Sequence, residues 1–492
     1  MKRACFSLTA AASALLLWIA TPSAQSDILQ QIKTEALQHS QVGALFDHLV
    51  TAIGPRLTGS PQHKAAADWA KEKLASIGLQ NARLEPFEFG RGWVLEGFIV
   101  EMVEPYYMPL IGYAEGWSAS TNGEVTGTPV FVGGKSAADV TAMKARLAGA
   151  IVLAQPMVTA FVREDRAQPT TSDASVRIGA PPMPRQGNQN QADARAIAQI
   201  VREAGPGVVI RSSAGEHGTM FVLGRDQGEN ALPSVVLAAE HYNMLARMIE
   251  RGMPVKMRVN VRTRFLTADT NTYNVLAEIP GTDATLKDEI VLLGAHLDSW
   301  HSSSGATDNA DGSAAVIEAM RILETIGVRP RRTIRIALWS GEEEGLLGSR
   351  AHVKMHYAGE ANAAARQKLS IYLNIDPGSG PIYGWYMENS APARTLFDKW
   401  LEPLKDLGVR RNVDGAIGST DHVSFREAGI AGFNPVQEYA TYDVRTHHTN
   451  VDTPERVREE DLKQNAAVLA WFVYNAAMTD EKLPRPEPRA ER

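Results

Sequence analysis

The chain has 492 residues, of which 44% are hydrophobic and 22% are charged, and its formal net charge is −6. This composition is typical of a soluble globular protein and argues against a membrane-embedded bundle and against a largely disordered chain. Acidic and basic residues are interspersed without a basic run, which argues against a nucleic-acid partner. The length is sufficient for two or three domains.

The first segment, residues 1–26, has the pattern of a secretory signal peptide. A short basic start precedes an apolar run over residues 8–20, which small and polar residues follow. Because that run is shorter than the roughly 20 residues of a membrane-spanning helix, we expect cleavage between Ser23 and Ser26 and no stable membrane anchor. The predicted location is periplasmic or extracellular. The only cysteine, Cys5, would leave with the signal, so a metal site must use His, Asp and Glu.

The next segment, residues 27–105, contains two helix signals. Asp27 is a suitable cap for a helix that begins at the following residue. Ser60 and Pro61 are a sharper start, and Gly78 is a suitable end for that second helix. A turn-rich loop is expected between the two helices.

Residues 106–264 have a different sequence pattern, in which short apolar runs alternate with turns. One helix is predicted over 191–204. We expect a small β-rich domain with one or two helices, inserted into the main domain. Within it, residues 157–190 are rich in Pro, Gln, Ser and Arg, and this composition predicts a long exposed loop.

Residues 265–478 show a β-α-β-α-β pattern. The predicted strands cover 289–295, 333–339 and 369–375, and the predicted helices cover 312–326 and 459–478. Strands that alternate with helices predict an α/β fold, with a mostly parallel central sheet and helices on both faces. The final segment, residues 479–492, is rich in Pro and charge and is predicted to be disordered.

Metal-type side chains follow three successive predicted strands. His296 and Asp298 follow the first strand, Glu342 and Glu343 follow the second, and Asp376 follows the third. Ligands of open α/β sheets bind outside the carboxyl ends of the strands. The sequence therefore predicts that these side chains meet at one edge of the sheet.

The same residues also suggest how chemistry is divided among them. Asp298 lies two positions after His296, so an extended backbone points both to one side and the carboxylate can fix the imidazole tautomer. Asp308 precedes a predicted helix in a turn that glycines flank; its carboxylate could bridge two cations or simply cap that helix. Of the adjacent Glu342 and Glu343, one can bind metal while the other accepts a proton from water, although a solvated acidic loop is the simpler interpretation.

Four further histidines occur as two pairs. His447 and His448 form a late pair close to the C-terminus. His352 and His356 share a helix face, but the residues between them lack the glutamate of the zincin motif. We therefore interpret His352 and His356 as structural.

Six motifs over residues 292–454 resemble, jointly and in order, those of the co-catalytic two-zinc exopeptidases, which include secreted bacterial leucyl aminopeptidases, carboxypeptidase Q and glutamate carboxypeptidase. The motifs are His-x-Asp, Asp-Asn-Ala-Asp-Gly, Glu-Glu-x-Gly-Leu-x-Gly-Ser, Asn-Ile-Asp, Ser-Thr-Asp-His and His-Thr-x-x-Asp-Thr. Residues 54–79 resemble the family's N-terminal segment, and the inserted region resembles its protease-associated domain. The resemblance implies that 27–105 and 265–478 together form the metallopeptidase domain.

The resemblance also implies a role for each matching residue. Asp308 would bridge two zinc ions, with His296 and Asp376 on one ion and Glu343 and His448 on the other. The all-N/O ligand set is compatible with zinc and also with cobalt or manganese.

In the same family pattern, Glu342 would be the general base and Asp298 would orient the imidazole of His296. Asp421 and His422 would lie in the shell around the ligands. His447 stands where some relatives have a tyrosine and is a candidate for stabilising the oxyanion.

The expected function is that of an exported zinc exopeptidase that removes residues from the N-terminus of peptides, with water activated by two metal ions and a glutamate base. The alternatives are a dipeptidase or carboxypeptidase on the same scaffold, a one-zinc glutaminyl cyclase, and a non-catalytic binding protein. The inserted region and the complete ligand set argue against the last two. The expected partner is a peptide or dipeptide substrate, and the motifs specify neither the side-chain preference nor the oligomeric state.

Overall fold

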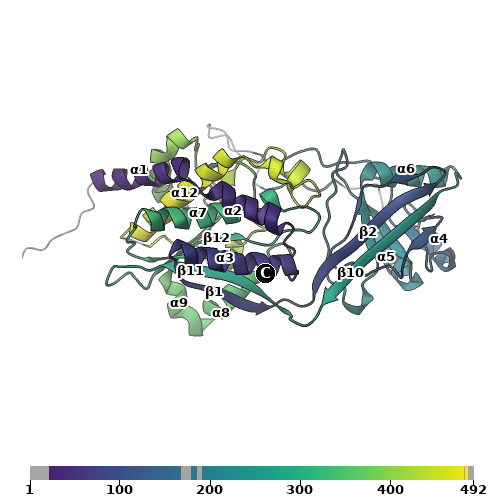
Figure 1. Ribbon diagram of the computed structural model, residues 1–492, viewed down its shortest axis with the longest axis horizontal. Helices are drawn as coiled ribbons and strands as arrows, with labels where there is room; N and C mark the ends of the chain where they lie inside the picture. The colour runs from purple at the N-terminus through teal and green to yellow at the C-terminus, as the bar shows by residue number, and fades with distance from the viewer. Residues whose placement is uncertain (1–21, 168–178, 185–190, 481, 486–492) are drawn as a thin grey trace, which may run out of the picture.

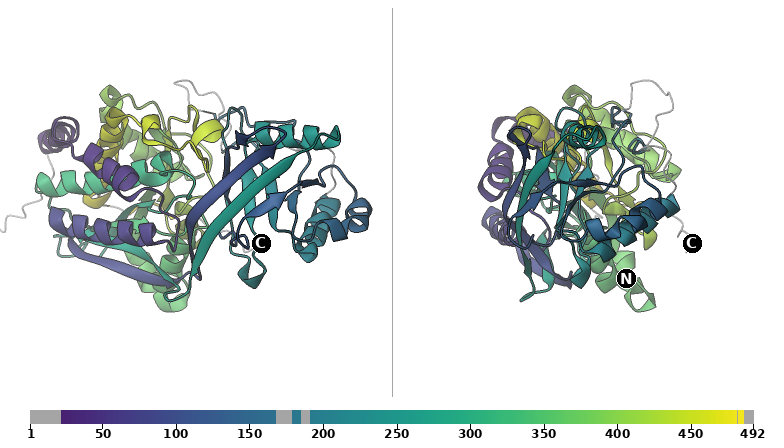
Figure 2. Two further views of the ribbon diagram at one scale, coloured as in Figure 1. Left: turned by 45° about the vertical axis from the view of Figure 1, so that its right-hand side comes forward. Right: turned by 90° about the vertical axis from the view of Figure 1, so that its right-hand side faces the viewer.

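The computed structural model describes residues 22–167, 179–184, 191–480 and 482–485. The chain forms two lobes that lie side by side, and the long strands β2 (Gly92–Glu104) and β10 (Lys256–Leu266) run between them into the smaller lobe (Figures 1 and 2). Most of the predicted signal peptide lies outside the described residues. None of the helices in the described ranges combines the length and the apolar composition that a membrane crossing requires.

A six-stranded sheet forms the centre of the larger lobe, with the strand order β1-β11-β13-β12-β14-β16. The bounds are β1 Gln80–Glu88, β11 Asn271–Ile279, β12 Ile290–His296, β13 Thr333–Trp339, β14 Leu369–Asn374 and β16 Gly432–Phe433. The four strands β13, β12, β14 and β16 are parallel to one another, whereas β11 pairs with β13, and β1 with β11, in antiparallel fashion. The predicted mostly parallel sheet is therefore confirmed.

Helices cover both faces of this sheet, as predicted. Strand β12 alternates, so that Val291 and Leu293 join the core beneath α7 (Asp311–Thr325) and α12 (Glu459–Met478), while Leu292 joins the opposite core. That opposite core includes side chains of α8 (Leu347–His356) and α11 (His422–Glu427). Burial on both faces is the reason that these strands read as continuous apolar runs. The remaining elements of this lobe are α1 Pro22–Gln38, α2 Val42–Asp47, α3 Pro61–Ile77, α9 Ala363–Lys368, α10 Ala391–Leu401, β15 Ile382–Trp385 and β17 Pro435–Gln437.

The smaller lobe, residues 92–266, is called the second unit below. It contains a four-stranded sheet of order β3-β2-β10-β5 and a five-stranded sheet of order β4-β9-β8-β7-β6. The bounds are β3 Met108–Pro109, β4 Gly112–Ala114, β5 Val125–Gly127, β6 Val130–Phe131, β7 Ile151–Leu153, β8 Val208–Ser212, β9 Ser234–Leu237, α4 Ala137–Ala142, α5 Gln191–Ala204 and α6 Ala239–Glu250. Because β2 pairs with β10, the four-stranded sheet begins before residue 106.

Local signals in the sequence match several element ends. The side chain of Ser60 accepts a hydrogen bond from the backbone N–H of His63 at 3.2 Å, and Gly78 ends α3 with φ of 105°. An N-cap of this kind is worth about 1 kcal/mol. The first helix begins at Pro22, before the predicted cap at Asp27.

Two segments differ from the expected exposed or disordered state in the parts that the structure describes. Val158, Val162 and Arg166 are buried, although a long exposed loop was predicted over 157–190. Leu483 is 2% exposed, although disorder was predicted for the C-terminal segment. In both segments, contacts with residues far away in the chain compensate for the unfavourable local composition.

Candidate metal centre

The carboxyl ends of the parallel strands bring the predicted ligands together. His296 is the last residue of β12, while Glu342 and Glu343 follow β13 and Asp376 follows β14. Asp308 enters from the turn before α7. His448 enters from residues 441–450, which are called the ligand loop below. The strand-edge prediction therefore holds as geometry, and the ligand loop approaches the edge from outside the sheet.

The two carboxylate oxygens of Asp308 face different partners. Its Oδ1 lies 3.2 Å from Nε2 of His296, and its Oδ2 lies 3.5 Å from Nε2 of His448. Asp376 Oδ1 lies 3.7 Å from the same nitrogen of His296, and Glu343 Oε2 lies 2.9 Å from the same nitrogen of His448. The five residues thus form two sets that share the carboxylate of Asp308 and are called the metal sets or ligand sets below. One set contains His296 and Asp376, and the other contains Glu343 and His448.

These close approaches lack hydrogen-bond geometry, and several atoms of the two sets have no hydrogen-bond partner within the described residues. They include His296 Nε2, Asp308 Oδ2 and both carboxylate oxygens of Glu343, all of which are buried. A buried polar atom without a partner costs free energy, so such a cluster calls for a bound ion. Imidazole nitrogens and carboxylate oxygens are common zinc ligands, and the donor set therefore fits the metals expected from the sequence.

The electrostatics of the centre also call for cations. Burial raises the pKa of Glu342 and of Glu343 well above the usual range, and nearby carboxylates such as Asp376 raise them further. Burial opposes protonation of His296, but the carboxylates of Glu342, Asp298 and Asp308 outweigh it and raise its pKa. The protein therefore gathers more negative charge than its own cations neutralise, which is the usual situation at a divalent metal site.

Asp298 holds several parts of the centre together. Its main-chain carbonyl lies 3.1 Å from Nδ1 of His296, closer than its own Oδ1 at 3.6 Å. The carboxylate accepts hydrogen bonds from the hydroxyl of Thr58 at 2.9 Å and from the backbone N–H of Glu343 at 3.3 Å. The carbonyl is thus the nearer oxygen of Asp298 to the imidazole, while the carboxylate joins the turn after β13 to Thr58.

Other predicted residues lie around these sets. Asp421 is fully buried, and burial raises its pKa to about 7. His422 Nε2 lies 3.1 Å from Oε1 of Glu388, so this imidazole is directed toward a carboxylate that the sequence did not indicate. The ring of His447 lies 3.8 Å from that of His448, between centroids.

Sequence reasoning missed Arg56, which is fully buried beneath the centre. Its guanidinium donates hydrogen bonds to the carbonyls of Leu297 at 2.8 Å, Ser304 at 2.7 Å and Gly305 at 2.9 Å. Arg56 therefore joins the loop after β12 to the turn before Asp308. The sequence marks residues 54–59 only as a turn-rich loop. A turn gives no indication that a charged side chain within it is buried, so no signal pointed to Arg56.

A cavity of about 720 Å³ opens onto the centre. Glu342, Asp376 and His447 line it beside the metal sets, and Arg350 and Ile417 lie among its other lining residues. A cavity of this size accommodates a short peptide or a small part of a longer one.

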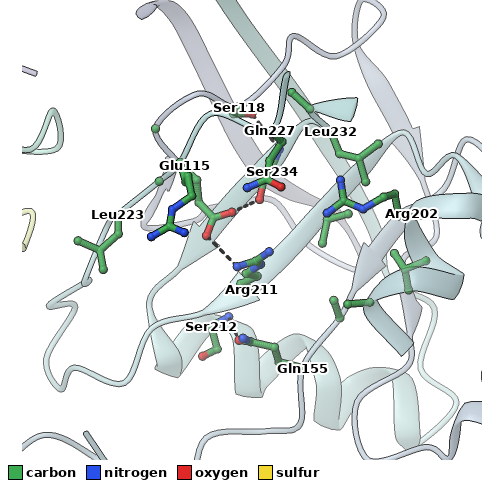
Figure 3. A pocket seen from close by; sticks show the side chains of 18 of the residues that line it. Glu115, Ser118, Gln155, Arg202, Arg211, Ser212, Leu223, Gln227, Leu232 and Ser234 are labelled. Atoms are coloured by element: carbon green, nitrogen blue, oxygen red, sulfur yellow. Dashed lines mark hydrogen bonds and ion pairs between the residues drawn. The ribbon is translucent and has the colours of Figure 1, made fainter. Parts of the chain in front are cut away.

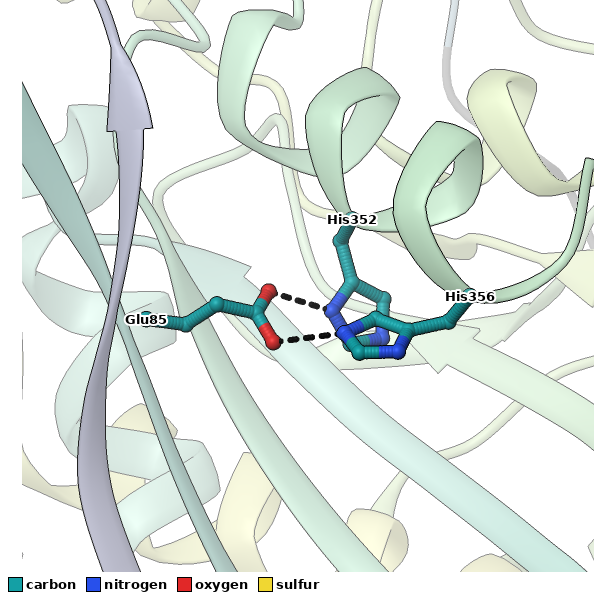
Figure 4. Close-up of side chains that lie close together, drawn as sticks. All are labelled: Glu85, His352 and His356. Atoms are coloured by element: carbon teal, nitrogen blue, oxygen red, sulfur yellow. Dashed lines mark hydrogen bonds and ion pairs between the residues drawn. The ribbon is translucent and has the colours of Figure 1, made fainter.

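A third histidine cluster lies away from this edge of the sheet. Glu85 on β1 accepts from His352 Nδ1 at 2.6 Å and from His356 Nε2 at 2.8 Å (Figure 4). These are ordinary hydrogen-bond distances, and both carboxylate oxygens are satisfied. The geometry is that of a structural link between β1 and α8, in line with the interpretation made from the sequence.

The second unit has a cavity of its own, of about 660 Å³, which none of the predicted site residues lines. Glu115 lies there between Ser234, which donates a hydrogen bond to it, and Arg211, whose Nη1 is 3.4 Å from Oε1 of Glu115 (Figure 3). Glu115 is thus paired with two neighbours in this cavity, in contrast to the carboxylate of Glu343 in the metal centre.

Comparisons with known proteins agree with this geometry. Residues 274–473 match Peptidase family M28. The chain is 26% identical to carboxypeptidase Q of Mus musculus over 439 residues, which is 89% of this chain and 86% of that protein. It is similar to the crystal structure of a Peptidase M28 precursor from Shewanella amazonensis, with a TM-score of 0.69 and 27% identity over 95% of this chain and 100% of that chain. A zinc aminopeptidase from Bacillus subtilis shares the fold, with a TM-score of 0.60 and 20% identity over 92% of this chain and 96% of that chain.

Proposed function

The chain belongs to the co-catalytic zinc exopeptidases of peptidase family M28, and from this premise we propose that it is an exported aminopeptidase that removes residues from the N-terminus of peptides with two zinc ions. Its membership makes it a metallo-exopeptidase that acts on peptides. The amino-terminal direction of cleavage, the number of ions, the site residues and export are the proposed parts.

The position of Asp308 is the observation that supports the proposal best. Its two oxygens face His296 and His448 at 3.2 and 3.5 Å, as a bridging carboxylate between two ions would. We assign Asp376 to the first ion, together with His296. We assign Glu343 to the second ion, together with His448.

When bound, two divalent ions supply Lewis-acid polarisation of the scissile carbonyl and lower the pKa of a water molecule. Glu342 lines the cavity beside Asp376 but is not needed in either ligand set. We assign it to accept the proton of the attacking water and to pass that proton to the leaving amine.

Two neighbours complete the proposed machinery. Asp298 orients His296 through its carbonyl and fixes the turn that carries Glu342 and Glu343. His447 lines the same cavity, where an imidazole N–H can stabilise the oxyanion of the tetrahedral intermediate.

A carboxypeptidase or dipeptidase is the second candidate. The similarity to carboxypeptidase Q extends over 89% of the chain and therefore includes the second unit. The ligand sets are compatible with either direction of cleavage, because both use the same carbonyl chemistry.

We propose roles for two parts of the chain outside the metal centre, the N-terminal segment and the second unit. Residues 1–26 act as a signal peptide, and the mature protein begins between Ser23 and Ser26. The second unit is a protease-associated domain that lines the approach to the active site. Mass determination of the protein recovered from the periplasm or medium tests the first point, since an uncleaved N-terminus there would contradict it.

Substrates with different free ends test the direction of cleavage. Aminoacyl anilides, free dipeptides and N-blocked peptides would be incubated with the protein, with and without a chelator. We expect chelator-sensitive release from anilides and no cleavage of N-blocked peptides. Cleavage of N-blocked peptides would instead support a carboxypeptidase, and cleavage of dipeptides alone a dipeptidase.

A further inference from the structure

Residues of the second unit form hydrogen bonds with the ligand loop, residues 441–450, which belongs to the larger lobe. On one side, the backbone N–H of Val222 donates to the carbonyl of His448 at 3.0 Å, and the N–H of Asn450 donates to the carbonyl of Met220 at 3.1 Å. Arg445 adds a hydrogen bond from its guanidinium to the carbonyl of Glu216 at 2.9 Å. Residues 216–222 of the second unit therefore run alongside the part of the loop that contains His448.

The second unit also contacts the first residues of the ligand loop. The carboxylate of Asp165 accepts the backbone N–H of Thr441 at 2.8 Å and that of Val444 at 2.9 Å. These two bonds satisfy donors that the turn at 441–444 would otherwise leave without a protein partner. The second unit therefore forms hydrogen bonds with both ends of the ligand loop.

Arg166 adds a buried ion pair with Asp443 to these contacts. Its Nε lies 3.0 Å from Asp443 Oδ2 and its Nη2 lies 2.7 Å from Oδ1, while its backbone N–H donates to Oδ2 at 2.7 Å. Both side chains are only 5% exposed, and the guanidinium lies over the rings of Tyr439 and Tyr442 at 5.2 and 5.1 Å. A buried bidentate pair of this kind fixes orientation as well as position.

From Asp443 the contacts lead to the metal sets. Asp443 Oδ1 lies 3.8 Å from Nδ1 of His447, whose ring lies between that of Tyr442 at 5.1 Å and that of His448 at 3.8 Å. His448 in turn has a backbone φ of 62°, a conformation that a residue with a side chain adopts only when its surroundings enforce it.

We propose that Arg166 is a positioning residue: through Asp443 and His447 it holds the imidazole of His448 against Glu343 and Asp308, so that the second unit completes the metal centre. This inference rests on the proposed role of His448 as a ligand. It makes the second unit a structural part of the active site, beyond any effect on the size of the substrate.

The test measures bound metal as well as activity. Arg166→Met and wild type would be loaded with zinc, dialysed and analysed for metal per chain, and the cobalt-loaded forms would be compared by visible absorption. We expect Arg166→Met to lose one equivalent of zinc, or to bind it roughly 10- to 100-fold more weakly, as is typical when a residue that supports a ligand is removed. The cobalt spectrum should change, and kcat should fall more than KM rises.

Two controls remove an arginine from an ion pair elsewhere: Arg258→Met affects the partly exposed pair with Glu101 inside the second unit, and Arg321→Met affects a pair with Glu318 in which the arginine is 5% exposed, as Arg166 is. Equal loss of metal in these controls would mean that general destabilisation is responsible and would overturn the proposal. Native zinc content and an unchanged cobalt spectrum in a folded Arg166→Met would also overturn it.

Three further variants keep the proposal testable if Arg166→Met fails to fold. Asp443→Asn alone and combined with Arg166→Met should lower the affinity for zinc by similar factors, because the two residues act as one unit. Additive losses would contradict action through Asp443. Asp165→Ala leaves the buried pair intact and should weaken zinc binding to a smaller extent. If no variant or wild type cleaves peptides, the metal measurements still decide this inference separately from the proposed activity.

Discussion

Nε2 of His448 lies 2.9 Å from Oε2 of Glu343, which joins the ligand loop to the turn after β13. The two residues belong to separate segments that no strand pairing connects. Their approach therefore depends on contacts that hold the loop, and on whatever cation neutralises the carboxylates around it.

Replacement of the proposed base should separate metal binding from catalysis. We expect Glu342→Gln to lower kcat by roughly 10²- to 10⁴-fold, because an amide cannot accept the proton of water, while the zinc content stays the same. Metal analysis and initial rates on one substrate measure both effects. Glu344→Gln is the matched control, since it removes the same charge from the same turn at a residue without a proposed role. Near-normal turnover in Glu342→Gln would eliminate this residue as the base.

Removal of the shared carboxylate should affect both ligand sets. We expect Asp308→Ala to reduce the amount of bound zinc per chain, because its two oxygens face both histidines at 3.2 and 3.5 Å. Activity should be lost with the metal. Metal analysis after dialysis measures the stoichiometry, and an unchanged value in a folded variant would refute the bridging role.

Removal of the metal should destabilise the fold measurably. An ion that binds only the native state stabilises it by about 4 kcal/mol when its free concentration is 1,000 times Kd. The unneutralised carboxylates of Glu342 and Glu343 should therefore lower the Tm of the protein in chelator, and added zinc should restore it. Thermal unfolding with and without chelator provides the measurement. A Tm that does not respond to chelator would argue against tight metal binding at this centre.

The Glu85 cluster should make stability depend on pH. Burial lowers the pKa of His352, so the unfolded chain binds a proton at a higher pH than the folded chain does. Folding stability should therefore fall as the pH drops below about 6.5, the usual histidine pKa. Burial acts to raise the pKa of Glu85, but the hydrogen bonds from His352 and His356 outweigh burial and lower this pKa. The contribution of Glu85 to folding stability is therefore lost only at more acidic pH, below about 4.5.

His352→Gln tests this assignment, because glutamine can still donate a hydrogen bond to Glu85 but does not titrate. The free energy of unfolding at pH 7.5 and 5.5 should decrease less in the variant than in wild type, in chelator for both proteins. An equal decrease in the two proteins would show that other groups determine the acid sensitivity.

Much of the fold and of the candidate site followed from the sequence alone. The helices over 191–204 and 459–478 and the strand over 333–339 have the predicted bounds, because their signals are local: apolar periodicity, a cap or a terminal breaker. The meeting of His296, Glu343 and Asp376 was also predictable. Parallel strands in one sheet necessarily place their carboxyl ends at one edge.

Only the tertiary structure decided which residues support that edge. Arg56 and Arg166 are polar residues in segments that predict loops, yet both are buried and hold parts of the centre in place. Their partners, Gly305 and Asp443, lie far away in the chain. No local pattern encodes such a pairing, because the free energy that keeps a charge buried comes from a partner that only the folded chain brings within reach.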